Sequence, residues 1–160
     1  MLSVPTGLSL RKLRRAILAT RVRRPAEFEE MLSELRDAGI FPTFKDVLVF
    51  AAALGFRRGN RKSFQKSSEP IDLEVFRGDF DRTIMSMIAI EENSDPKMLA
   101  PSNEAERVLC FEEYANGGLE IMKREISDGK QDWREGLLSL IHREEGDQTI
   151  LDDITELANF

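Results

Sequence analysis

The sequence predicts a mainly α fold: a helical domain that begins with a short strand and a pair of helices and contains one further short strand. Apolar residues recur at three- and four-residue steps over most of the chain, which is the period of an amphipathic helix. Alternating side-chain character, which is typical of a strand, is confined to two short segments. With 160 residues, 41% of them hydrophobic, the chain can bury one sizeable core.

The first elements are basic. Apolar residues in Leu8–Ala19 have roughly helical spacing, and Arg or Lys takes several of the other positions, so this segment is either a helical arm or a partly ordered tail. The next segment, Ala19–Arg24, alternates in character and predicts a short strand.

Two helices are predicted after this strand. Pro25 suits a first helical position, and the apolar residues that follow keep helical spacing until Gly39 ends the helix. Thr43 caps the second helix, with Asp46 three residues later as a short capping box. Residues 47–54 are apolar almost all round, so we expect this helix to be the most buried in the chain.

The chain after these two helices is predicted to be mainly helical, apart from residues 57–76. The polar and basic residues 57–70 predict a loop, and the alternating segment Ile71–Phe76 predicts the second short strand. Helical periodicity then covers Asp79–Glu92, a long stretch that starts at Ser102 or Asn103, and Trp133–Arg143.

The triplet Asn116-Gly117-Gly118 lies inside the long helical stretch. Two adjacent glycines there predict a helix break, a kink or a close crossing with another helix. We therefore expect Gly118 to be structurally constrained rather than chemically active.

Three parts of the chain follow from these patterns. Residues 1–20 form a basic N-terminal arm, and residues 21–146 form a helical core. Residues 147–160 form an acidic amphipathic C-terminal helix, because apolar residues lie on one face of that segment and acidic residues on the other.

Charge is divided along the chain. Residues 1–66 carry 14 Lys and Arg against 6 Asp and Glu, a net charge of +8. Residues 67–160 carry 9 against 23, a net charge of −14. The overall net charge of −6 therefore conceals a basic N-terminal half, which is typical of proteins that bind nucleic acid or an anionic membrane. The alternative interpretation is two solvated basic segments without a ligand.

Cysteine use and hydropathy limit the class of protein. Cys110 is the single cysteine, and its apolar neighbours predict a buried thiol rather than a reactive one. No apolar run approaches the ~20 residues that cross a membrane. We expect a reducing, cytoplasmic location. The acid-free first 25 residues are also similar to a mitochondrial presequence, although basic residues recur after Phe56, beyond any cleavage point.

Catalytic motifs are sparse, and we expect no catalytic residue, no metal site and no cofactor. His142 is the single histidine, and with one cysteine the usual zinc-ligand spacings are excluded. The candidate metal cluster of a magnesium-dependent nickase is the set of carboxylates Asp72, Glu74 and Asp79, which is a weak signal. The pair Glu112-Glu113 is expected on an ordinary solvated helix face.

The basic strand and the helix pair resemble the ribbon-helix-helix unit. In that family two chains pair their strands into a ribbon that enters the DNA major groove. The outward set here is either Thr20, Val22 and Arg24 or Arg21 and Arg23, depending on register. The start of the second helix, Thr43 to Lys45, would offer amides to a phosphate. The predicted DNA-binding residues are Arg11, Lys12, Arg14, Arg15, Arg21, Arg23, Arg24, Lys45, Arg57, Arg58, Arg61, Lys62 and Lys66.

A second resemblance covers most of the chain. Four strings in order, RVRRPAEFEEM, FKDVLVFAAALGFR, KSSEPI and FEEYANGGLEI, are similar to the DNA phosphorothioation-associated protein 4 family. This family accompanies the Dnd systems of bacteria and archaea, which replace a non-bridging phosphate oxygen of DNA with sulfur, with companion proteins that restrict unmodified DNA. The resemblance implies a prokaryotic defence role linked to DNA, and it brings no catalytic motif with it.

The expected function is a non-catalytic DNA-binding accessory protein, a regulator or adaptor, of a phosphorothioation modification or restriction system. The expected partners are double-stranded DNA, other Dnd-system proteins and a second copy of the chain, most simply in a homodimer. Two alternatives stay open: a magnesium-dependent nickase of the same system, and a protein-interaction subunit that docks on a Dnd-type enzyme.

Overall fold

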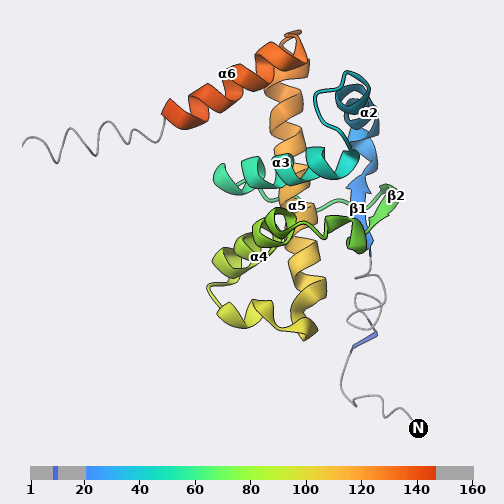
Figure 1. Cartoon of the computed structure of the whole chain (residues 1–160), viewed down its shortest axis with the longest axis vertical. Coiled ribbons are helices and arrows are strands. Elements are labelled where there is room, and N and C mark those ends of the chain that lie inside the picture. The colour runs from blue at the N-terminus through green and yellow to red at the C-terminus, as the bar shows by residue number, and fades with distance from the viewer. Residues whose placement is uncertain (1–8, 11–20, 147–160) are drawn as a thin grey trace, which may run out of the picture. The chain divides into compact units, whose positions relative to one another are not determined.

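In the computed structural model, the described residues are 9–10 and 21–146 (Figure 1). The helices predicted within residues 1–20 and 147–160 lie outside them, apart from Ser9 and Leu10. The chain divides into two compact units, Met1–Glu120 and Ile121–Phe160. The mainly α prediction is confirmed, because helices contain most of the described residues and the strands among them form one two-stranded sheet.

The elements along the chain are β1 (Arg21–Pro25), η1 (Ala26–Phe28), α2 (Glu29–Asp37), α3 (Phe44–Arg57), β2 (Ser67–Asp72), η2 (Leu73–Phe76), α4 (Asp79–Asn93), η3 (Pro96–Leu99), η4 (Pro101–Asn103), α5 (Glu104–Met122), η5 (Lys123–Ser127) and α6 (Trp133–Gly146). Of these, η1 to η4 are short 3-10 helices and η5 is a π-helical turn that continues α5. Each helix that was predicted within the described residues 21–146 therefore occurs, with ends shifted by a few positions.

Strand β1 pairs antiparallel with β2 of the same chain. Arg21 lies opposite Asp72, and an irregularity between Val22 and Arg24 shifts the register. Val22 is fully buried and Arg24 is 7% exposed, whereas Arg21 is exposed. The strand that was predicted to pair with a copy of itself thus has an intramolecular partner, and the outward-facing set is Arg21 and Arg23.

The second strand is displaced from its predicted position. It was expected at Ile71–Phe76, but β2 begins at Ser67 and the chain turns after Asp72 into η2. This turn carries Phe76 into the core, where it is 1% exposed and its ring meets that of Phe111 edge-to-face at 5.6 Å. Burial of the aromatic ring stabilises the turn over a longer strand.

The predicted cap of α3 is confirmed. The Asp46 amide donates to the Thr43 hydroxyl oxygen at 3.3 Å, and the Thr43 amide donates to the Asp46 carboxylate at 3.1 Å. Pro25 differs from its prediction, because it ends β1 instead of beginning a helix. The helix proper, α2, begins at Glu29 after the short turn η1.

Helix α5 continues without interruption through Asn116, Gly117 and Gly118, and neither glycine has a positive φ. A Cβ on Gly118 would lie 1.7 Å from the Ala51 carbonyl oxygen of α3. Reciprocally, a Cβ on Gly55 of α3 would lie 2.1 Å from the Tyr114 carbonyl oxygen. Of the three predicted alternatives, the close helix crossing is therefore the one observed.

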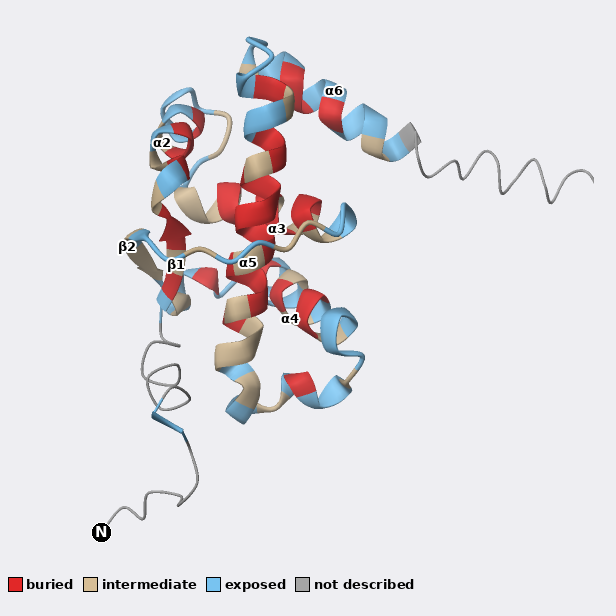
Figure 2. Cartoon of the chain, turned by 180° about the vertical axis from the view of Figure 1, so that it is seen from behind, coloured by how far each residue is buried: buried red, intermediate tan, exposed pale blue. Residues whose placement is uncertain are grey.

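The central helix is α5 rather than α3. Twelve of its 19 residues are buried, against seven of 14 in α3, so the prediction that α3 is the most buried helix is wrong. Figure 2 shows the buried residues concentrated along the middle of α5 and on one side of α3. Helix α5 is more enclosed because α3, segment 60–64 and β1 all lie against it.

The second unit contains η5 and α6. Leu137 and Leu140 of α6 are buried, and a Cβ on Gly136 would lie 2.4 Å from Ile126 of η5. An ion pair at 3.4 Å joins Arg143 to Glu125. The missing side chain at Gly136 therefore allows α6 to pack closely on the turn before it.

Candidate nucleic-acid interface

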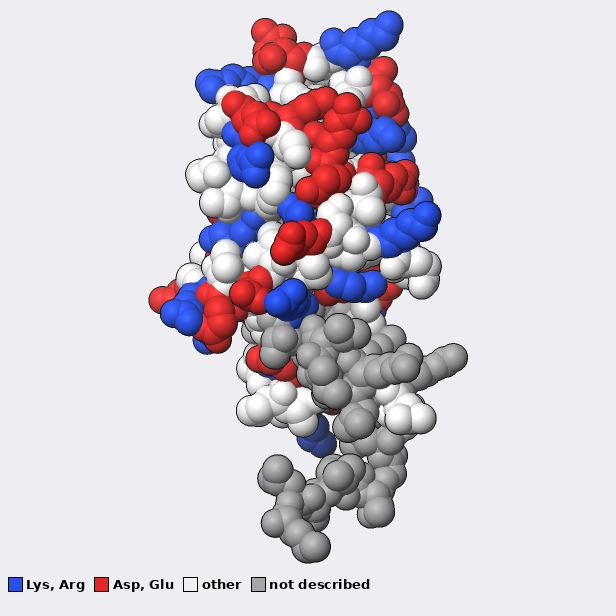
Figure 3. Space-filling model, turned by 90° about the vertical axis from the view of Figure 1, so that its right-hand side faces the viewer, with Lys and Arg blue, Asp and Glu red and all other residues white. Residues whose placement is uncertain are grey.

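Folding brings the basic half of the sequence against the acidic half. Five cations from residues 1–66 form ion pairs with carboxylates from residues 67–160, and the pairs are Arg21–Asp72, Arg23–Glu112, Lys45–Asp81, Arg61 with Glu92 and Glu113, and Lys62–Glu120. On the face shown in Figure 3, basic and acidic side chains are interspersed. The division of charge along the sequence is thus compensated in part in space.

Arg23 is fixed by several contacts. Its amide and its Nε both donate to the Glu112 carboxylate, at 3.0 and 2.7 Å, and its Nη1 donates to the Phe64 carbonyl oxygen at 3.3 Å. Its guanidinium also lies over the Phe64 ring, 4.4 Å from the centroid. Glu112 is 4% exposed, so the expectation of a solvated position is wrong for this residue. Burial raises the pKa of the Glu112 carboxyl, and the Arg23 donors oppose that rise.

Arg24 points to the opposite side of β1 and is buried. Its Nε donates to the Glu69 carbonyl oxygen at 2.7 Å, and its Nη2 lies 3.1 Å from the Glu29 carboxylate. The Phe44 ring lies 4.4 Å beneath its guanidinium. Arg24 therefore stabilises the junction of the sheet with α2 and α3 and presents little surface to a ligand.

Arg61 lies between two carboxylates. Its Nη1 is 2.9 Å from Glu92 of α4, and its Nη2 is 2.8 Å from Glu113 of α5. The Tyr114 hydroxyl donates to the second oxygen of Glu92. This hydrogen bond, assisted by Arg61, lowers the pKa of Glu92, whereas burial and the nearby Glu92 raise the pKa of Tyr114 to about 12. The cluster ties α4, α5 and the segment after α3 together.

Lys45 joins the first turns of two helices. Its Nζ is 2.7 Å from Asp81 of α4 and 3.5 Å from Asp46 of its own helix. Asp81 is 6% exposed, and its hydrogen bond raises the pKa of Lys45. The Lys45 side chain, one of the predicted DNA-binding groups, is therefore already paired with two carboxylates of the chain.

The other predicted cations are more accessible. Arg57 and Arg58 are exposed at the end of α3, and Lys66 is exposed just before β2. Lys62 is 48% exposed and pairs with Glu120. The remaining predicted DNA-binding residues, which are Arg11, Lys12, Arg14 and Arg15, lie outside the described residues.

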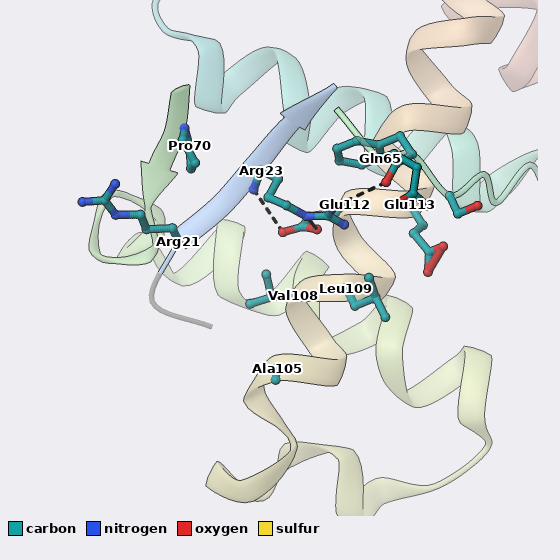
Figure 4. A pocket seen from close by; sticks show the side chains of 11 residues that line it. Arg21, Arg23, Gln65, Pro70, Ala105, Val108, Leu109, Glu112 and Glu113 are labelled. Atoms are coloured by element: carbon teal, nitrogen blue, oxygen red, sulfur yellow. Dashed lines mark hydrogen bonds and ion pairs between the residues drawn. The ribbon is translucent and has the colours of Figure 1, made fainter. Parts of the chain in front are cut away.

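A groove of about 470 Å³ runs between β1 and the first half of α5 (Figure 4). Its lining includes Arg21 and Arg23 of β1 and Phe64 and Gln65 of the segment before β2. The α5 residues that line it recur with helical spacing, and they are Ala105, Val108, Leu109, Glu112 and Glu113. This spacing was visible in the sequence. The position of segment 63–65 above the helix was not, because it depends on contacts between residues far apart in the chain.

A family model for "DNA sulphur modification system-associated protein 4" matches residues 21–160. The chain belongs to this family. The resemblance noted from the four strings is confirmed, and the association with a DNA sulphur modification system comes with it. Searches of curated proteins and of solved structures gave no match.

The match to the sulphur modification family begins at Arg21, the first residue of β1, and extends through the whole of the described fold from there. It also contains residues 147–160, which the sequence predicted to lie beyond the helical core. The basic residues of the arm precede the matched region.

Two of the three carboxylates of the nickase alternative, Asp72 and Glu74, form ion pairs with arginines. Asp72 lies 3.4 Å from Arg21, and Glu74 pairs with Arg77 on the next turn. Among residues 9–10 and 21–146, no three His, Cys, Asp or Glu side chains form a group that could hold a metal ion. Cys110 is 2% exposed, and burial raises the pKa of its thiol. Within the same part of the chain, no helix has the length and apolar character needed to cross a membrane.

Proposed function

We propose that this family member is a non-catalytic accessory protein of a DNA sulphur modification system, an adaptor that binds duplex DNA through its N-terminal arm and a partner protein through its folded core. The association with the system is a property of the family, and the adaptor role is our proposal. Of the predicted DNA-binding residues, those of the arm and Arg21, the first cation of the core, are the ones to which we assign the contact with DNA.

The observation that carries this proposal is the distribution of compensated charge. Residues 1–26 contain no Asp or Glu. The arm contains four cations, and Arg21, whose side chain is 58% exposed, is the fifth. Within the described core, by contrast, Arg23, Lys45 and Arg61 already donate to buried or half-buried carboxylates. An arginine that must leave a carboxylate to reach a phosphate gains little, so the arm offers the more favourable contacts.

The DNA-binding role is tested by measuring duplex affinity as a function of salt. If the arm and Arg21 neutralise about 4 to 5 phosphates, log affinity falls against log salt with a slope of about −3.6 to −4.5. Replacing Arg11, Lys12, Arg14 and Arg15 together by alanine should remove roughly 3 to 4 of that slope. The matched control replaces the exposed core residues Arg77 and Arg82, which should leave the slope unchanged. An unchanged slope in the arm variant would exclude the arm as the DNA contact.

A partner-protein surface is supported by α4. Phe80, Ile84 and Met87 recur at helical spacing, and Phe80 and Met87 are 69% and 51% exposed. Exposed apolar residues in one stripe are typical of protein–protein contacts, whereas scattered ones need no explanation. We expect Phe80→Ser with Met87→Ser to abolish binding to a purified enzyme of the same modification system while duplex DNA affinity is retained. Unchanged binding to every such enzyme would contradict the adaptor role.

The homodimer stays a prediction. Helix α3 packs against α2, α4 and α5 of its own chain, so its apolar surface gives no separate argument for a second copy. A ribbon made with a second chain would use the edge of β1 where the Arg23 amide already donates to Glu112. Light scattering after gel filtration decides the point, and a monomer mass at micromolar concentration would exclude the intermolecular ribbon.

A further inference from the structure

We propose that the groove between β1 and α5 accepts one unpaired DNA nucleotide, with its base in the groove and its phosphate on Arg21. This inference rests on the proposed DNA-binding function and adds to it a preference for a locally unpaired or single-stranded site. It is carried by the groove's planar wall, its apolar floor and the position of its mouth.

The planar wall is the stacked pair of Arg23 and Phe64. The Arg23 guanidinium lies 4.4 Å from the Phe64 ring centroid and is held there by hydrogen bonds to Glu112 and to the Phe64 carbonyl oxygen. Its side chain is still 33% exposed, and Nη2 makes no hydrogen bond within the described part of the chain. Guanidinium planes and aromatic rings are the surfaces on which proteins stack unpaired bases. A plane that is already fixed loses little conformational freedom when a base stacks on it.

The floor and the size of the groove suit a base. Ala105, Val108 and Leu109 give an apolar surface along α5, and the volume of about 470 Å³ lies in the range of small-ligand sites. The Gln65 side chain at the rim supplies an amide, which can both donate to and accept from a base edge. Figure 4 shows Val108, Leu109 and Glu112 along α5, on the side of the helix that faces Arg23.

The two carboxylates of the groove do not repel a phosphate at its mouth. Glu112 accepts from Arg23, and Glu113 accepts from Arg61, so each is compensated by an arginine. Arg21 lies at the start of β1, and its ion pair with Asp72 is long, at 3.4 Å, between side chains that are 58% and 65% exposed. Such an exposed pair is weak, so a phosphate can compete for Arg21.

Arg21 is also the first residue after the arm in the sequence. The arm, residues 1–20, is acid-free, and the proposed function assigns it to DNA. Arg15 is six residues earlier, so an extended chain places it at most about 20 Å away, the length of a few nucleotides. A strand held by the arm is therefore within reach of the groove.

The test uses the full chain with a thymidine trinucleotide as probe and methyl NMR as readout. We expect the methyl resonances of Val108 and Leu109 to shift on titration, whereas those of Leu32 and Leu48, which are fully buried away from the groove, stay in place. Ala105→Phe, which fills the floor, should abolish the shifts. Phe64→Leu should weaken trinucleotide binding about tenfold, the scale on which loss of one stacking contact weakens single-strand binding.

Matched controls lie outside the groove. Phe80→Leu removes an exposed aromatic ring of α4, and Arg82→Ala removes an exposed arginine of the same helix. Both should keep the parental trinucleotide affinity, whereas Arg21→Ala should lower it. Circular dichroism and thermal unfolding identify any variant that has lost its fold, and Ala105→Gln provides a smaller plug if Ala105→Phe does so.

The failure of this inference is distinguishable from failure of the proposed function. Groove variants that leave the trinucleotide shifts intact, or the absence of any shift at millimolar probe, overturn the groove site, even if the arm variant loses duplex binding as expected. Shifts at Val108 and Leu109 produced by an acidic peptide of residues 147–160 but not by the trinucleotide also overturn it. Loss of duplex binding in the arm variant, with groove shifts retained, supports both proposals separately.

Discussion

Helix α5 is held by two different kinds of contact on two of its sides. Toward α3, the contact is backbone against backbone, with Gly118 under the Ala51 carbonyl and Gly55 under that of Tyr114. Toward β1 and segment 61–64, the contact is ionic, with Glu112, Glu113 and Glu120 each bound to a cation of the basic half. The contact with α3 depends on the absence of side chains at the two glycines. The contact with β1 and segment 61–64 depends on the charge of the side chains.

The two kinds of contact tolerate amino-acid substitution to different degrees. A backbone contact leaves no room for even one added carbon, since neither helix can move away without disturbing its packing against the other elements. An ion pair near the surface exchanges readily with water and salt, and its contribution depends on how deeply each partner is buried. Variants on the two sides should therefore differ in size of effect and in their response to pH and salt.

The largest effect is expected on the glycine side. Gly118→Val should lower the free energy of unfolding by at least about 3 kcal/mol, because its Cβ would overlap the Ala51 carbonyl. Urea denaturation measures this change. Gly78→Ala is the matched control, since the nearest atom to its Cβ would be a side-chain oxygen of Asp81 at 3.4 Å, an ordinary contact. Equal stability of Gly118→Val and the parent would show that the crossing is looser than described.

The next effect is expected at the buried ion pair. Arg23→Ala leaves Glu112, which is 4% exposed, without its cation and should cost about 3 kcal/mol near pH 7. Replacing both residues by methionine should cost much less than the sum of the single changes, which a double-mutant cycle measures.

The stability of Arg23→Ala should also depend on pH in a defined direction. Burial already raises the pKa of Glu112 in the folded protein, and Arg23→Ala keeps the amide donor at this position but takes away the charge and the side-chain hydrogen bond that also oppose the rise. The folded state then binds a proton more tightly than the unfolded state, so the stability of Arg23→Ala should recover as pH falls below the folded pKa of Glu112 and decline as pH rises through it. A stability difference from the parent that is the same from pH 4 to pH 8 would contradict this explanation.

A smaller effect is expected at Tyr114. Tyr114→Phe removes the hydrogen bond to Glu92 and should cost about 1 kcal/mol. In the folded protein the pKa of Tyr114 is raised to about 12, above the value of about 10 for an unfolded tyrosine. The stabilisation is therefore complete below about pH 10 and is lost as pH rises toward 12. Urea denaturation at a series of alkaline pH values should show a larger loss of stability in the parent than in Tyr114→Phe, because Lys45 and Cys110, whose pKa values are also raised, contribute to the loss in both.

The smallest effect is expected at Lys62. Its pair with Glu120 joins side chains that are 48% and 34% exposed, so Lys62→Ala should cost less than about 1 kcal/mol. High salt should reduce even this difference, whereas it should leave the effect of Gly118→Val unchanged. A large and salt-insensitive loss at Lys62 would remove the distinction between the two sides of α5.

Local patterns predicted the helices and their caps well. The Thr43 and Asp46 capping box and the apolar period of α4 are properties of short segments, so they can be read without knowing the fold. The Asn116-Gly117-Gly118 triplet left three alternatives, because a missing side chain indicates closeness without naming the neighbour. Only the position of Ala51 in space decides among them.

The site was predicted less well because it is made of distant contacts. Basic residues in the first half favoured a DNA surface, yet Arg23 and Glu112 are 89 positions apart and no local pattern pairs them. The signal that was available is the helical spacing from Ala105 to Glu112, which places this glutamate on the same side as Val108 and therefore toward the interior.

The attachment of β1 also has a mechanical consequence. If residues 1–20 are bound to a long DNA molecule that is moved by other proteins, tension in that segment enters the core at Arg21. Hydrogen bonds between antiparallel strands run across the strand axis, so a pull directed along β1 loads its bonds to β2 together, in shear, rather than one after another. The hydrogen bonds from Arg23 to Glu112 and Phe64 share the same load. Under a pull in that direction, the first strand of the fold is an anchor that transmits force to α5 instead of peeling away from it.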